Sequence, residues 1–512
     1  MESGKTKADA KRAQAANARA GKTDRLGTER MGRLLLEFSI PAIVSMVFNT
    51  LYNVVDTVFL GQAVGEVGVA VTTVAMPVMT ILMGFSMLAG QGGNALAAIQ
   101  LGRGEKAAVE KTLGNAALML IGLAAAVAVA ALVFIDPLLA LVGASGEVYE
   151  PSKTFVQIVC CGFAFQSLGM GLNNFLRTAG KPNLSLAATV VGTVMCIVFN
   201  YLFVMVAGFG IAGSAWATIC GQAFGMVPVV WYFVLSKTAP FRLRLSCMKP
   251  DARLMGQIAS LGLASFVMQV ATTVVSIVLN HVLTLCGAQS TVGVAGALAA
   301  VGVAQKAVSF AITPLIGLNM GAQPIIGYNY GAQSWARVLS CFKWGTAWAV
   351  AIATAFFVIA HVLSVPLVAL FGVTGELESF AVDALRIYTL VFPLVGLQIF
   401  GSSYFQSSGQ PVKAAILELT RQVIFLIPLY LLLPPALEQL LGVPGLTGVL
   451  VAVPASDALS VVVTAVFVMV EIRSLRARLR GSGGTGGAKR ATIDSSGEER
   501  EARWETAGAT TR

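Results

Sequence analysis

Three polar side chains in the first long apolar stretch could together bind a cation. Asn49, Asn53 and Asp56 are four and three residues apart, which places them on one face of a helix, with Tyr52 beside them. A carboxylate inside an apolar helix is costly and usually functional. Asp56 could hold a proton, because burial disfavours the charged form, or bind sodium together with amide oxygens. Asp56 could instead have a structural role and accept hydrogen bonds that join two helices.

Other polar residues interrupt apolar stretches farther along. Asn200 is the natural amide partner of Asp56, although a lone amide also commonly joins two helices by a hydrogen bond. In the second half, Glu418 and Arg421 are three residues apart, which favours an internal ion pair. Asp457 has no charged neighbour in the sequence and could bind a cationic substrate or a proton.

The elements that position these residues are membrane-spanning helices. Of 512 residues, 56% are hydrophobic and 12% are charged, and the mean hydropathy is +0.78, whereas soluble domains carry about 25% charged residues. Runs such as 116–134 and 349–365 contain no charge. With their apolar flanks they approach the roughly 20 residues that a transmembrane helix needs. The runs are continuous rather than alternating, so we predict an all-α integral membrane protein, not a barrel.

About twelve spans are expected, and the loop charges give their direction. The predicted spans are 34–60, 69–98, 112–135, 152–176, 183–207, 211–236, 255–285, 292–327, 338–370, 380–405, 412–433 and 446–471. Lysine and arginine concentrate in alternate loops, which predicts an even number of spans with both termini in the cytoplasm. The same rule explains the net charge of +10 without nucleic acid as a partner.

The chain carries an internal repeat. Gly102 and Gly331 end similar segments, Gly180 and Gly409 begin similar turns, and each pair is separated by 229 residues. Because these glycines fall in loops on one side, each half holds six helices and the repeat is parallel, as in many secondary transporters. We expect two lobes with boundaries at 31–245 and 246–480, a basic N-terminal tail at 1–30, and a disordered cytoplasmic tail at 481–512.

At these residues the sequence resembles the multidrug and toxic compound extrusion (MATE) family. The similarity extends over about residues 31–475 and is carried by Ser39–Ala42, Leu51–Gly61, Asn173–Arg177 with Gly180–Pro182, Gln323–Gly331, and Arg421–Pro428. The resemblance implies two six-helix lobes in a V around a central cavity. It also implies export of cationic, lipophilic compounds driven by H⁺ or Na⁺.

The resemblance also implies roles for individual residues. Asp56 corresponds to the ion-coupling aspartate of the family and Asn200 to its helix-five asparagine. Many members carry a second aspartate where this chain has Val204. Asp56 would then work with amides and hydroxyls, or coupling would rely partly on the carboxylates of the second half. The candidate ion-coupling residues are Asp56, Asn200, Asn53, Tyr52 and Thr73, and the candidate cavity residues are Asn49, Gln305, Gln323, Glu418, Arg421 and Asp457.

The predicted function is therefore a secondary antiporter of the cell membrane that exchanges small molecules for H⁺ or Na⁺. We expect a monomer in membrane lipid, no cofactor, and no metal beyond a possible Na⁺ at Asp56. A flippase of lipid-linked sugars is the alternative, although such proteins tend to have additional helices and a basic cavity; a receptor or scaffold is a remote one. The sequence contains no G-x-S-x-G or H-E-x-x-H motif, so an enzyme is not expected.

Overall fold

The computed structural model describes residues 25–141, 146–290, 293–369 and 376–508, and every regular element in these ranges is a helix. Eleven helices are long and apolar enough to cross a membrane. A pair of helices bent by 49°, Leu377–Tyr388 with Phe392–Ser407, makes a twelfth span. The predicted number of spans and the all-α class are confirmed.

The first half forms one bundle, which we call the N-lobe. Its helices are α3 (Met31–Val64), α4 (Glu66–Gly102), α5 (Lys106–Val133), α6 (Ile135–Leu141), α7 (Tyr149–Thr178), α8 (Pro182–Asn200) and α9 (Gly210–Val234). The short α2 (Arg25–Thr28) precedes them and packs on the second half, where Asn329 and Arg337 donate hydrogen bonds to the carbonyl oxygen of Leu26. The end of α8 continues into a π-helical segment, Tyr201–Val206. Large apolar side chains such as Phe163 and Phe175 are fully buried between these helices.

The second half forms the C-lobe. Its helices are α10 (Ala252–Ala288), α11 (Gly293–Gly331), α12 (Trp335–Val362), α13 (Ser364–Ala369), α14 (Glu376–Tyr388), α15 (Phe392–Ser407), α16 (Pro411–Leu419), α17 (Ile427–Leu441) and α18 (Gly445–Gly508). A π-helical segment, Thr420–Leu426, joins α16 to α17. The predicted N-terminal tail lies almost wholly outside the described residues, and side chains of α18 are described only as far as Arg480. Disorder of 481–512 remains a prediction.

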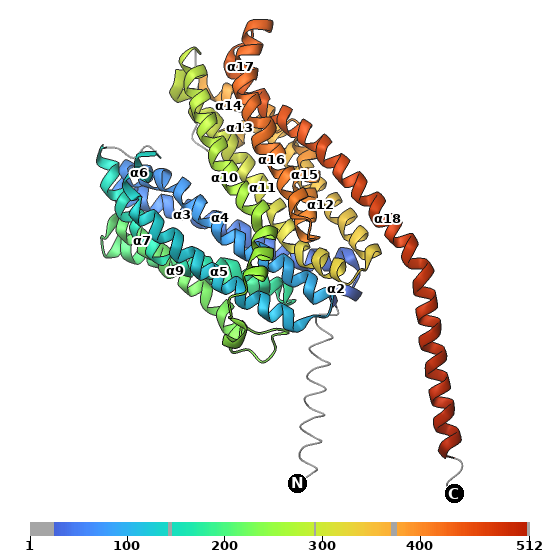
Figure 1. Ribbon diagram of the computed structural model, residues 1–512. Helices are drawn as coiled ribbons and strands as arrows, with labels where there is room; N and C mark the ends of the chain where they lie inside the picture. Colours follow the sequence, from blue (N-terminus) through green and yellow to red (C-terminus); the bar gives the residue numbers. More distant parts are fainter. Residues whose placement is uncertain (1–24, 142–145, 291–292, 370–375, 509–512) are drawn as a thin grey trace.

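The two lobes meet at one end and diverge toward the other, so the molecule has the shape of a V (Figure 1). Helix α10 packs along α4, and α11 packs along α3, so each lobe supplies two helices to the contact. The diverging ends carry α6 on the N-lobe and α17 on the C-lobe (Figure 1). Four helices, α3, α4, α10 and α11, therefore form the boundary between the lobes, and we call the part of this boundary toward the diverging ends the cleft.

At the closed end the backbones of the two lobes touch. A Cβ atom on Gly102 would lie 1.9 Å from the carbonyl oxygen of Tyr328, and one on Gly331 would lie 2.0 Å from that of Ile99. Asn94 Nδ2 donates a hydrogen bond of 2.9 Å to Gln323 Oε1, across a separation of 229 residues. The two glycine contacts are exchanged by the same 229-residue shift. The Asn94–Gln323 bond therefore lies on the pseudo-twofold axis, and the parallel repeat is confirmed.

Candidate functional site

Asp56 lies inside the N-lobe, in the part of α3 that approaches the open end. Its side chain is 8% exposed, and its Oδ1 accepts a hydrogen bond of 2.6 Å from Ser214 Oγ on α9. Asn200, the last residue of α8, lies within hydrogen-bonding reach of the same carboxylate. Side chains from two other helices thus converge on Asp56, and one of them, Asn200, was expected from the sequence.

The oxygen atoms around Asp56 fit a bound cation. Among the described residues Asp56 forms no salt bridge, and the buried Oδ1 of Asn200 has no hydrogen-bond donor. A buried carboxylate without a positive partner is costly, and in proteins it is commonly relieved by a proton or a bound cation. Carboxylate, hydroxyl and amide oxygens are ligands of hard cations. The site can therefore hold either a proton or a sodium ion.

Val204, at the position where many members of the family carry a second aspartate, lies four residues after Asn200. Val204 is buried in the π-helical segment that begins immediately after Asn200. Such segments occur frequently at functional sites, because they rotate the side chains that follow them. An apolar side chain at this point supplies no oxygen, so the described part of the site contains a single carboxylate.

The remaining ion-coupling candidates, and the candidate cavity residue Asn49, are only partly described. Thr73 on α4 and Asn49 on α3 are both exposed, so they do not share the burial of Asp56. The side chains of Tyr52 and Asn53 lie outside the described residues. Their roles remain predictions.

In the C-lobe the structure corrects an expected ion pair. Arg421 Nε lies 2.8 Å from Asp457 Oδ1 on α18, and both side chains are largely buried. Between Glu418 and Arg421, in contrast, no ion pair occurs among the described residues. The helix adopts π-helical geometry at Thr420, between these two residues, and the arginine then reaches the neighbouring helix. Asp457 is therefore neutralised, although its sequence neighbours suggested an isolated carboxylate.

The remaining candidate cavity residues occupy different places. Gln323 is buried at the inter-lobe contact, where Asn94 bonds to it and Thr178 Oγ1 in turn donates to Asn94 Oδ1 at 2.7 Å. It therefore lies in the closed contact instead of on an open cavity wall. Gln305 is half-buried on α11, and Glu418 is half-buried near Ser402.

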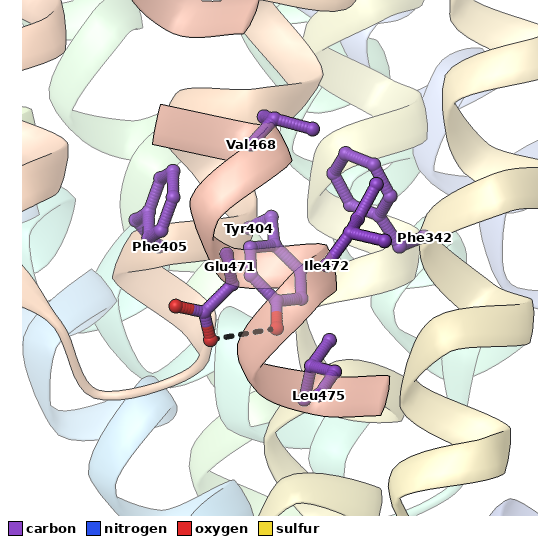
Figure 2. Close-up of a pocket in the computed structure, with 7 residues that line it drawn as sticks. All are labelled: Phe342, Tyr404, Phe405, Val468, Glu471, Ile472 and Leu475. Atoms are coloured by element: carbon purple, nitrogen blue, oxygen red, sulfur yellow. Dashed lines mark hydrogen bonds between the residues drawn. The ribbon is translucent and has the colours of Figure 1, made fainter. Parts of the chain in front are cut away.

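Sequence reasoning missed one buried carboxylate, Glu471 on α18. It accepts hydrogen bonds from Tyr404 Oη at 3.4 Å and Gln410 Nε2 at 3.0 Å, and Lys413 Nζ lies 3.4 Å away. Figure 2 shows Glu471 and Tyr404 among aromatic and aliphatic side chains, which include Phe342, Phe405 and Leu475. The carboxylate is thus held by hydrogen bonds inside an apolar part of the C-lobe, and this network joins α15, α16 and α18. Its signal in the sequence was a lone glutamate at the end of an apolar run.

Comparison with known proteins agrees with the two-lobe fold. The MatE family model matches residues 41–202 and 262–432. The multidrug export protein MepA of Staphylococcus haemolyticus is 24% identical over 453 residues, which cover 87% of this chain and 94% of that protein. MepA of Staphylococcus aureus (strain MSSA476) is 22% identical over 458 residues, with the same coverage.

Solved structures share the arrangement of helices. A crystal structure of MATE in complex with MaL6 has a TM-score of 0.81 at 20% identity, covering 88% of this chain and 99% of that one. An outward-facing conformation of a multidrug resistance MATE family transporter has the same TM-score and identity, with 88% and 98% coverage. The family model covers more than half of the residues, and its members are transporters, not enzymes. The chain therefore belongs to the MatE family of multidrug efflux transporters.

Proposed function

We propose that the protein is a secondary antiporter that exports small amphiphilic compounds in exchange for H⁺ or Na⁺. The observation that carries this proposal is Asp56, a buried carboxylate without a cationic partner among the described residues, placed between three helices of one lobe. The V-shaped arrangement of the two lobes supports alternating access, in which one lobe rocks against the other.

The coupling would act through the charge of Asp56. When the site is empty, the buried carboxylate costs several kcal/mol, on the order of 3–5 for an unpaired charge. A proton or sodium ion removes this cost and favours the N-lobe packing in which Ser214 and Asn200 close around the carboxylate. Each 1.4 kcal/mol of differential stabilisation changes the ratio of two conformations about tenfold. Binding of the ion can therefore drive the change between open and closed cleft.

Large apolar side chains are exposed on the inter-lobe side of two cleft helices. Ile81 on α4 and Phe310 on α11 are exposed. Each lies seven residues, about two helical turns, before a residue of the inter-lobe contact, Leu88 and Gly317 respectively, and therefore on the same side of its helix. Some of the proteins similar to this chain are multidrug export proteins. Export of lipophilic compounds follows from these observations as a proposal, and the expected positive charge of the substrate remains a prediction to be tested.

We further propose a location and an orientation. Basic side chains such as Arg103, Lys181 and Arg337 gather near the closed end, where α4, α7 and α11 finish. Positively charged loops remain in the cytoplasm. We therefore place the closed end and both termini in the cytoplasm of a cell, with the cleft open to the outside, and a monomer in membrane lipid as the working unit.

The test is dye export from proteoliposomes that contain the purified protein. An H⁺ gradient and a Na⁺ gradient are imposed separately, and efflux of ethidium and of an uncharged lipophilic dye is followed by fluorescence. Wild type should export dye under one of the gradients, and Asp56→Asn should lose this dependence. Asp136→Asn is the matched control, because it removes an exposed carboxylate from α6. Gradient-driven export by Asp56→Asn at the wild-type rate would exclude Asp56 as the coupling residue.

A further inference from the structure

We propose that Lys306 binds the substrate and selects compounds that carry a negatively charged group beside an apolar body. This inference rests on the proposed export function, because it uses the same cleft. Lys306 is an exposed side chain of α11. The substrate charge that we propose is negative, whereas the sequence led us to expect a positively charged substrate.

The position of Lys306 on its helix shows that it faces the other lobe. A Cβ atom on Gly317 would lie 2.5 Å from Ile43 Cα on α3, so this side of α11 contacts the N-lobe. Lys306 is eleven residues before Gly317, which is about three helical turns and therefore the same side of the helix. Around Gly302, one further turn along, no atom lies within 4 Å of a Cβ atom. The lobes have separated at this level, and Lys306 faces the cleft.

A polar side chain of α10 borders the same opening. A Cβ atom on Gly262 would lie 1.8 Å from the carbonyl oxygen of Leu88 on α4. Asn280 is eighteen residues farther along α10, about five turns, and so lies on the same side. Asn280 is exposed, and α10 packs beside α11. An amide donor therefore lies along the wall that carries the lysine.

No described side chain of the protein neutralises the charge of Lys306. Among the described residues Lys306 has no ion pair and no side-chain hydrogen bond. The described side chains of the four cleft helices include two carboxylates. Glu37 pairs with Arg25 at the closed end, and Asp56 lies inside the N-lobe against Ser214. The described cleft wall thus presents a positive charge without an opposing negative one.

This arrangement fits an anionic amphiphile. A lysine at bilayer depth is costly in contact with lipid and is usually found facing a water-filled cavity. Within a cleft with low-dielectric walls, its field attracts an anion and repels a cation. Phe310 lies one turn from Lys306 on the same helix and is 49% exposed. A carboxylate or phosphate on the lysine would therefore place an attached ring on Phe310.

The test compares two dyes that share a xanthene ring system, the anionic fluorescein and the cationic rhodamine 123. Wild-type proteoliposomes should export fluorescein more efficiently. Lys306→Gln should lower kcat/KM for fluorescein by about five- to tenfold and leave rhodamine 123 unchanged or faster. Lys306→Arg should retain the preference, and Lys306→Glu should reverse it. Lys249→Gln, which removes an exposed positive charge from the loop before α10, should have no effect.

Two further arms complete the test. The first arm asks whether the anion is a lipid headgroup. Movement of nitrobenzoxadiazole-labelled phosphatidylglycerol and phosphatidylcholine across the bilayer is followed by dithionite quenching. Lys306-dependent movement of the anionic lipid alone would support the inference for a lipid. If no gradient drives either dye, the proposed antiport fails, but binding of the two dyes to purified protein still tests Lys306. Equal loss of both dyes in Lys306→Gln, or an unchanged preference, would overturn the inference.

Discussion

Replacing Gly331 with alanine should open the contact that closes one end of the cleft. The added Cβ atom would lie 2.0 Å from the carbonyl oxygen of Ile99, where ordinary contact begins at 3.4 Å. The obstacle is backbone, which cannot rotate away as a flexible side chain can. The α4–α11 contact must therefore separate by more than an ångström, and the same argument applies to Gly102 against Tyr328.

The size of the effect follows from overpacking. Extra methyl groups in a tightly packed contact cost about 1–3 kcal/mol, and this cost destabilises only the conformation with the closed contact. The equilibrium should therefore shift away from that conformation about five- to 150-fold. Gly102→Ala should act in the same direction. The double variant should shift the equilibrium by less than the sum, because one separation of the lobes relieves both clashes.

Distances between spin labels at Asp136 on α6 and Glu438 on α17 measure this shift, after replacement of the seven native cysteines. Both positions are exposed and lie toward the diverging ends of the lobes. Wild type should populate a long distance, and Gly331→Ala a shorter one as the cleft closes at this end. Gly122→Ala is the control, because its Cβ would meet no atom within 4 Å. An unchanged distribution in folded Gly331→Ala, or an equal shift in the control, would refute the reasoning.

Two other variants test buried polar contacts. Asn94→Leu leaves Gln323 without its partner on the axis, and an unsatisfied buried amide costs about 1–3 kcal/mol. Thermal unfolding of the purified variant should therefore show a lower Tm than wild type. The double variant Asn94→Leu with Gln323→Leu should partly restore the Tm, because neither amide is then left unsatisfied. Asp457→Asn leaves the guanidinium of Arg421 buried without its counter-charge, at a cost of about 3–5 kcal/mol; a Tm equal to wild type would show that the pair is dispensable.

The sequence by itself determined the membrane architecture. Apolar runs, alternating loop charges and the 229-residue repeat are local or periodic signals. They can therefore be recognised without knowing which faces of the helices pack together. The spans and the twofold relation between the lobes were correctly predicted for this reason. Asp56 was also identified as a candidate from the sequence, because a carboxylate in an apolar helix is unusual whatever its partners are.

The tertiary structure decided which polar groups meet. Arg421 was expected to pair with Glu418 three residues away, but it pairs with Asp457, 36 residues away on another helix. Ser214, 158 residues from Asp56, was not anticipated as its partner, and Gln323 lies in the closed contact instead of on an open wall. That Lys306 faces the space between the lobes could be recognised only from the structure, in which the lobes diverge beside it. Partners of this kind depend on which helix faces meet and on where a π-helical turn rotates them, and neither is encoded in the spacing of residues along one span.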